Sequence, residues 1–254
     1  MHKIRIKSRH ATHDALRELF KPLRATLPFL IRFGSVTEAN YRHVPINTIE
    51  AIKLTANKLQ MKTVFETNQI QSPDFGTIEE FETLIQTHDF SSNLVIKRKY
   101  HSRGRDMVLI TTKEEAERWL NDNRYNKYYF YFEYEFPCDR EYRIHCSKYY
   151  DETMEVRKRV YADRRDSFGR NLGNSYFAID FPKPPCWDKI VEMSKKSVDL
   201  LGLDFGCVDV LYKNGGGEES IMICEVNSAP ALGEKTTEFY FEMLKEIINK
   251  KEQQ

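Results

Sequence analysis

The stretch IMICEVNSAPALG, residues 221–233, decides the interpretation of this chain. Its first half has the apolar content of a β-strand, in which side chains two residues apart face the same side. Glu225 and Asn227 therefore present a carboxylate and an amide oxygen on one face. Pro230 interrupts the strand, and a new helix is expected after Gly233. This strand is predicted to hold two oxygen ligands together.

A second acidic strand precedes the first. The run FGCVDVLY, residues 205–212, carries Asp209 among apolar neighbours, and Asn214 with three glycines separates the two strands. These residues predict a hairpin turn that sets Asp209 opposite Glu225. Three oxygen ligands would then converge, as suits Mg2+ bound together with phosphate oxygens. The alternative is an ordinary hairpin with two solvated polar faces.

Composition narrows the class of protein. The 254 residues suffice for one large or two small domains with a substantial core. Because 39 basic residues face 38 acidic ones, there is no overall signal for binding a polyanion. Residues 1–32 are nevertheless rich in lysine and arginine, so an acidic substrate or a nucleic acid could dock there. A solvated basic strand and helix explains the same bias.

Cysteine usage and hydropathy indicate the compartment. The five cysteines are odd in number and show no CxxC spacing, which argues against a disulfide scaffold or a zinc site. No apolar run has membrane-spanning length, and the first residues lack the apolar core of a signal peptide. We expect a soluble, cytoplasmic protein without a membrane partner, in the cytosol of its own cell or of a host.

Strands and helices alternate along the chain, with runs of consecutive antiparallel strands, so the predicted class is α+β. Asn47 and Glu50 form a capping-box pattern, which predicts a helix with apolar positions as far as Leu59. Thr112 and Glu115 predict a second helix start in the same way. The other expected strands are 27–33, 93–97, 128–136, 141–146 and 155–161, and the other helices are 78–86, 187–201 and 235–250.

Two segments have residues suited to a nucleotide. Lys97 ends an apolar strand before the polar loop 101–106, where an ammonium and loop N–H groups could grip phosphate. A basic surface hairpin is the alternative. The aromatic segment 128–136 includes Glu133 and Glu135 and could flank a flat purine, although most such strands are simply core.

Charged residues on the next strands suit ribose, phosphate or an acid. Glu141 and Arg143 share a face, so the carboxylate could hold ribose hydroxyls and the guanidinium a phosphate. A cross-strand salt bridge explains the pair equally well, and His145 on that face is expected to be structural. Lys158 lies between two arginines in a segment dense in cations, which suits an anionic transition state. A solvated face explains part of that density.

The order of these signals resembles the ATP-grasp superfamily, and most of all its carboxylate–amine ligases of the RimK and glutathione synthetase type. Lys58 precedes a helix, and Lys97, the aromatic segment, EYR, a basic strand, VDV and EVNSAP follow in turn. The resemblance runs from about residue 45 to residue 244. The pair of EVNSAP with GCVDVLY is its most specific part.

The resemblance implies two α+β subdomains that clasp ATP: a short N-terminal region 1–45, a first subdomain 46–136 and a second subdomain with the metal site 137–254. It implies ATP contacts for Lys58, Lys97, Ser102, Gly104, Glu133, Tyr134, Glu135, Phe136 and Glu141. In this set the lysines hold phosphates, the glycine loop covers them, residues 133–136 form the adenine hinge, and Glu141 holds the ribose. The implied catalytic residues are Arg143, Lys158 and Arg159, and the implied Mg2+ ligands are Asp209, Glu225 and Asn227.

The implied activity is an ATP- and Mg2+-dependent ligase. It would activate a carboxylate as an acyl phosphate, release ADP, and join the acid to an amine as an amide or peptide. Its partners would be small-molecule or peptide acids and amines, possibly acidic, and the protein would be a monomer or homodimer. The alternatives are a small-molecule kinase of the same fold and a non-catalytic protein that binds nucleotide or nucleic acid.

The chain departs from the family pattern at three places. The region before Pro45 is shorter than the usual N-terminal domain, which helps to build the acceptor site. The loop after Lys97 is poor in glycine, and Ala231 stands where the family commonly has glycine. The substrate is therefore left open.

Overall fold

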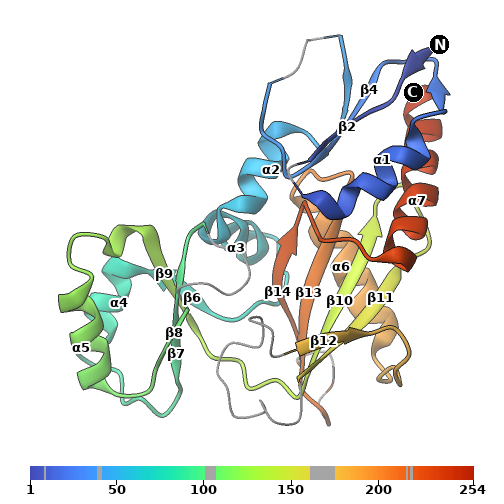
Figure 1. The fold of residues 1–254 in the computed structure, drawn as a ribbon. Helices are drawn as coiled ribbons and strands as arrows, with labels where there is room; N and C mark the ends of the chain where they lie inside the picture. Colours follow the sequence, from blue (N-terminus) through green and yellow to red (C-terminus); the bar gives the residue numbers. More distant parts are fainter. Residues whose placement is uncertain (9, 39–41, 101–106, 161–174, 216, 218–219) are drawn as a thin grey trace.

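The computed structural model describes residues 1–8, 10–38, 42–100, 107–160, 175–215, 217 and 220–254. Within these residues, four sheets with flanking helices form an α+β arrangement, as predicted (Figure 1). Within these residues no helix is long and apolar enough to cross a membrane.

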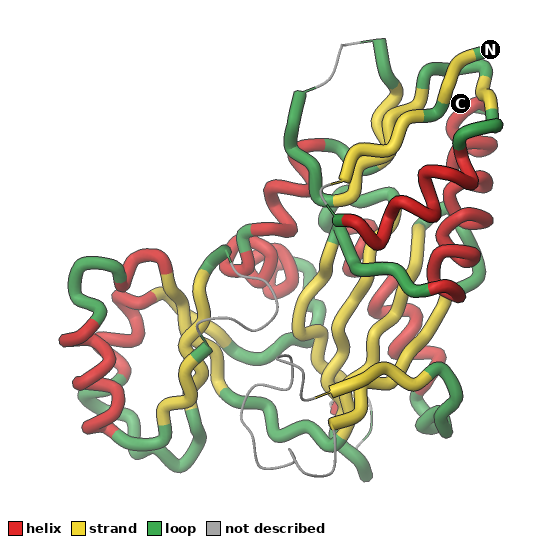
Figure 2. Tube along the Cα trace, in the orientation of Figure 1, coloured by secondary structure: helices red, strands yellow, loops and turns green. Residues whose placement is uncertain are grey.

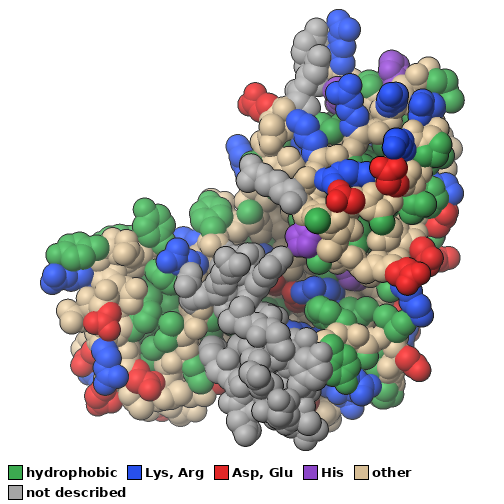
Figure 3. Space-filling model, in the orientation of Figure 1, with side chains coloured by type: hydrophobic (Ala, Val, Ile, Leu, Met, Phe, Trp, Pro, Cys, Tyr) green, Lys and Arg blue, Asp and Glu red, His purple; other side chains and the backbone are tan. Residues whose placement is uncertain are grey.

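The first and last segments of the chain form one unit. Three parallel strands, in the order β2 (Arg5–Ser8), β4 (Phe29–Phe33) and β5 (Val44–Ile46), lie beside the small antiparallel pair β1 (His2–Lys3) and β3 (Arg24–Ala25). The turn η1 (Ala11–His13) and helix α1 (Asp14–Phe20) follow β2, and the long helix α7 (Glu234–Glu252) packs against α1 (Figure 1). Apolar side chains of these helices and of β4 share one core. Figure 3 shows lysine and arginine side chains gathered on the visible face of this unit.

A second unit is a four-stranded antiparallel sheet. Its order is β6 (Phe75–Thr77), β9 (Phe130–Tyr134), β7 (Leu94–Arg98) and β8 (Val108–Ile110), and a short turn, η2 (Lys127–Tyr129), leads into β9. Helices α4 (Ile78–Leu84) and α5 (Lys113–Asp122) cover its outer face, away from the rest of the molecule (Figure 2). The Thr77 hydroxyl and the Glu80 carboxylate form a capping box that starts α4.

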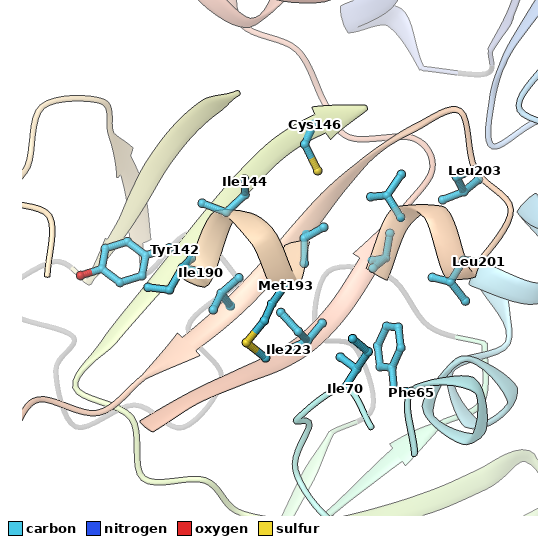
Figure 4. Close-up of a cluster of buried hydrophobic side chains, with 14 of the residues drawn as sticks. Phe65, Ile70, Tyr142, Ile144, Cys146, Ile190, Met193, Leu201, Leu203 and Ile223 are labelled. Carbon is cyan, nitrogen blue, oxygen red and sulfur yellow. The ribbon is translucent and has the colours of Figure 1, made fainter. Parts of the chain in front are cut away.

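The third unit is a five-stranded antiparallel sheet. Its order is β12 (Ser175–Ala178), β11 (Met154–Val160), β10 (Arg140–Ser147), β13 (Phe205–Tyr212) and β14 (Ile221–Asn227). Helix α6 (Trp187–Leu200) packs on one face, where Ile144, Ile190 and Ile223 belong to a large buried cluster (Figure 4). Helices α2 (Ile49–Ala56) and α3 (Lys58–Thr67) add side chains to the same core.

The helix expected from Asn47 differs from the observed one in two ways. Thr48 is its N-cap, because the Thr48 hydroxyl accepts from the backbone N–H of Ala51. Asn47 instead has φ 61° and uses its side chain to bond the backbone at the start of β13. The single expected helix is also two helices, because Asn57 is extended and its side chain accepts from Gln60 N–H to start α3.

Candidate functional site

The β13–β14 hairpin places Asp209 directly opposite Glu225, as its glycine turn predicted. The register then shifts, because Val210 pairs with Ile223, and Cys224 is the extra residue of a β-bulge. Ile223 keeps its place in the core, whereas Cys224 and Glu225 are only partly buried. The bulge thus changes the facing of the strand just where it reaches the acidic residues.

The three predicted metal ligands lie together. Asn227 Nδ2 donates to Glu225 Oε1 at 3.0 Å and to Asp209 Oδ2 at 3.3 Å. Arg143 Nε and Nη2 bond the two Asp209 oxygens at 2.6 and 2.9 Å. Lys58 Nζ lies 3.2 Å from Glu225 Oε2 and donates to the Val226 carbonyl at 3.1 Å. Two carboxylates therefore share one amide and are each held by one cation.

This donor set fits a divalent cation. Burial raises the pKa of Asp209 against the opposing effect of Arg143, and the Glu225 carboxylate adds to the rise. A cation between the carboxylates would relieve that repulsion, and a half-turn of the Asn227 amide would present its oxygen instead of its nitrogen. In the described part of the chain no group of three or more His, Cys, Asp or Glu side chains could hold a metal, so the site rests on two carboxylates and an amide.

A second charged cluster lies where the four-stranded sheet meets α3. Lys97 Nζ donates to Glu133 Oε2 at 2.5 Å, and the Tyr131 hydroxyl donates to Glu133 Oε1 at 2.8 Å. Lys62 Nζ approaches the same Oε1 to 3.4 Å, beyond good hydrogen-bonding geometry. Glu133 and Lys62 are 2% and 0% exposed, so this carboxylate is the buried counter-charge of two lysines.

The lysines of this cluster differ in their electrostatic setting. Burial disfavours the charged carboxylate of Glu133, but Lys62 and Lys97 outweigh it and lower its pKa to about 2. Burial also disfavours the charged form of Lys97, yet Glu133 outweighs it and raises the pKa of Lys97. Burial lowers the pKa of Lys62, with only partial compensation by Glu133. Lys97 is therefore the firmly held cation at the edge of the site.

Lys158, but not Arg159, joins Arg143 on the site face of the five-stranded sheet. Lys158 pairs with Glu141 across β10 and β11, and its Nζ lies 2.9 Å from Glu141 Oε2. The Arg143 guanidinium also stacks 4.6 Å above the ring of Phe177 on β12. Because neighbouring strand residues face opposite sides, Arg159 lies on the α6 side of the sheet.

The predicted adenine hinge is the connection between the two antiparallel sheets. Tyr134 ends β9 and its N–H donates to the Asp74 carbonyl. Glu135 is bonded twice to Asn93, through its backbone N–H at 2.9 Å and its carboxylate at 2.7 Å. Phe136 follows as a partly buried residue. Ser102 and Gly104, which were also predicted to contact ATP, lie outside the described residues.

Sequence reasoning missed several residues of the site. Lys62 follows Lys58 by one helical turn, and this i, i+4 spacing on one face was a readable signal. Cys224 and Phe177 reach the site through a bulge and a strand pairing, which leave no local signature. His145 is structural as expected: it is buried against the Tyr240 hydroxyl, and burial lowers its pKa to about 3.

Comparison with known proteins finds structural likeness without sequence likeness. No family model and no curated protein matches this chain. A D-alanine–D-alanine ligase from Bacillus anthracis complexed with ATP is 14% identical over 87% of this chain and 78% of that one, with a TM-score of 0.62. The VanG D-Ala:D-Ser ligase from Enterococcus faecalis is 15% identical over 89% and 73%, with a TM-score of 0.66.

A third structure belongs to a different enzyme. Carboxyaminoimidazole ribonucleotide synthase from Aspergillus clavatus, complexed with ATP, is 16% identical over 80% of this chain, with a TM-score of 0.59. The match spans about half of that synthase, 53% of its length. All three are ATP-grasp carboxylate–amine ligases, and the chain described here has the ATP-grasp fold.

Proposed function

We propose that this protein is an ATP- and Mg2+-dependent ligase that joins a carboxylic acid to an amine and releases ADP and phosphate. One observation carries the proposal: Asp209 and Glu225 face each other on paired strands, with Arg143 and Lys58 bonded to them, in the fold of known ATP-dependent ligases. Clustered carboxylates and cations of this kind suit a triphosphate with its metal ion.

The metal would be held by Asp209, Glu225 and Asn227, and when bound it would offset the negative charge of the phosphates. Lys58 and Lys97 would hold phosphate oxygens. Each ammonium has three N–H donors, so a lysine bonded to a carboxylate keeps donors for a phosphate. The Glu133 carboxylate would in this way position Lys97 rather than neutralise it.

The nucleoside would occupy the connection between the two sheets. Residues 133–136 would border the adenine and Glu141 would hold the ribose. Glu141, the proposed ribose ligand, is paired with the Lys158 ammonium, so the ribose would lie beside that cation. We likewise propose that residues 46–136 and 137–254 act as the two clasping parts, with the short region 1–45 beside them.

Arg143 and Lys158 would act on the transferred phosphoryl group, because their side chains share the face that carries Asp209. An oxygen of the acid attacks the γ-phosphorus and ADP leaves, which gives an acyl phosphate. The amine nitrogen then attacks the acyl carbon, phosphate leaves and the nitrogen loses a proton. No side-chain nucleophile is needed, so positioning and charge stabilisation account for the catalysis.

The acid and the amine would be small molecules or peptides, and the basic face of the N-terminal unit favours acidic ones (Figure 3). Since the cysteines are free in the structure, we propose that the enzyme works in the cytosol.

Hydroxylamine trapping tests this function. The protein is incubated with ATP, Mg2+, hydroxylamine and one carboxylic acid at a time, and we expect an acid-dependent hydroxamate together with ADP. Glu225→Gln should lose the product, while Glu155→Gln should keep it, because Glu155 pairs with Lys183 away from the site. A stable phosphoester would instead indicate a kinase. Salt-dependent binding of nucleic acid without ATP turnover would indicate a binding protein.

A further inference from the structure

Three arginines gather on the α6 side of the five-stranded sheet. Arg157 pairs with Tyr142 and the next pair is Lys158 with Glu141, so the register carried on by one residue sets Arg159 opposite Arg140. Burial lowers the pKa of Arg157, and repulsion by the charges of Arg140 and Arg159 lowers it further. Like charges side by side on a sheet destabilise it unless something compensates them.

In the part of the chain that the structure describes, no carboxylate compensates these charges. Within the described residues none of the three guanidiniums pairs with a carboxylate, and Arg140 has only a 3.5 Å contact with the Tyr142 hydroxyl. The Nε atoms of Arg157 and Arg159 are buried without a hydrogen-bond acceptor. Glu155, which shares their strand face, is bonded to Thr153 and Lys183 instead. Buried donors in native proteins nearly always have a partner, so these two Nε atoms point to a missing acceptor.

Another buried donor without a partner lies on the same side of the sheet. Trp187, the first residue of α6, is 7% exposed and its indole Nε1 is buried without an acceptor. Its ring centroid is 5.0 Å from that of Tyr142, the strand partner of Arg157. Cys186, which precedes it, makes no side-chain cap for α6. Among the described residues, this region therefore has cationic and neutral donors without matching acceptors.

We propose that Arg140, Arg157 and Arg159 form a binding site for a small molecule with a terminal phosphate. A phosphate dianion offers three oxygens to three guanidiniums, whereas a carboxylate offers only two oxygens and one charge. Since strand residues alternate, this site is on the opposite face of the sheet from Arg143 and Lys158. It does not depend on the proposed ligase function.

Calorimetry with inorganic phosphate at constant ionic strength tests the site. The titration uses Lys97→Ala protein, so that phosphate binding near Lys97 does not contribute. We expect saturable binding in that background and at least tenfold weaker binding after adding Arg159→Gln. Adding Arg124→Gln should change the affinity less than twofold, because Arg124 is exposed and stacks on Tyr125 elsewhere.

Thermal unfolding supplies a second readout. Phosphate should raise the unfolding temperature of the Lys97→Ala protein and should not raise that of the Lys97→Ala/Arg159→Gln protein. If the latter does not fold, Arg140→Gln takes its place, with the same expectation. Equal phosphate affinity in the two proteins would overturn the proposal. So would phosphate binding that never saturates at constant ionic strength.

Discussion

Replacing Glu133 with glutamine removes the single buried negative charge between two lysines without changing its shape. The pKa of about 2, against the ordinary 4.5, corresponds to about 3 kcal/mol of stabilisation at neutral pH. Breaking a buried ion pair costs roughly 3–5 kcal/mol in other proteins, because the remaining charge is left uncompensated. We therefore expect Glu133→Gln to lower the free energy of unfolding by about 3 kcal/mol at pH 7.

The pH dependence of this loss has a definite sign. Because the folded protein lowers the pKa of Glu133, its stabilisation is complete above about pH 4.5 and disappears as the pH falls towards 2. The difference between wild type and Glu133→Gln should therefore shrink on acidification. Urea unfolding at pH 7, 5 and 3.5 measures it. A difference below about 1 kcal/mol at pH 7, or one that stays constant to pH 3.5, would refute the reasoning.

Two further variants check the cause. Glu135→Gln is the control, because Glu135 is partly exposed and bonds Asn93 rather than a lysine. This variant should lower the free energy of unfolding by less than about 1 kcal/mol. The double variant Glu133→Gln/Lys62→Met should regain part of the stability lost in Glu133→Gln, since it removes the uncompensated ammonium. No recovery would mean that Lys62 is not the charge that Glu133 compensates.

The other predictions concern the site and its supports. Glu225→Gln should lower ATP turnover by at least about a hundredfold, because it weakens one of the proposed metal ligands. Its unfolding temperature should stay near that of wild type, and wild-type turnover would contradict the metal assignment. Lys97→Ala should weaken ATP binding but not adenosine binding in calorimetry, and an equal loss for both would contradict a phosphate role. Asn47→Gly keeps the positive φ but loses three buried side-chain bonds to backbone groups at the start of β13, so urea unfolding should show a loss of about 2–3 kcal/mol. Gly34→Ala should lower the free energy of unfolding by about 1–3 kcal/mol, because φ is 63° and the new Cβ would lie 2.9 Å from a methyl group of the loop after β14. Gly215→Ala should lower it less, because Gly215 also has a positive φ, 79°, but open space around it.

Local patterns predicted the hairpin of the site well. The period of two and the glycine turn were enough to set Asp209 opposite Glu225, and the structure has that pairing. The same patterns did not predict the bulge at Cys224, because an extra residue is inserted where strand pairing and core packing favour it. The position of the bulge depends on Ile223 keeping its place in the core.

The start of helix α2 could not be predicted from the sequence pattern alone. Asn47 and Thr48 are both good N-cap residues, so the sequence pattern could not choose between them. The choice was made by the backbone N–H groups of Asp204 and Phe205, which lie far away in the chain and donate to Asn47 Oδ1. Asn47 links β13 to the start of α2 instead of capping the helix.

The sequence by itself determined the class of the fold and the acidic hairpin, because these follow from short-range periodicity and turn chemistry. Only the tertiary structure decided which charges meet. Glu133 compensates Lys62 and Lys97, and Lys158 rather than Arg159 stands beside Arg143. Three arginines meet without a carboxylate from the residues that the structure describes. The energy of a charge depends on its burial and on neighbours brought in by distant strands, and no local pattern contains that information.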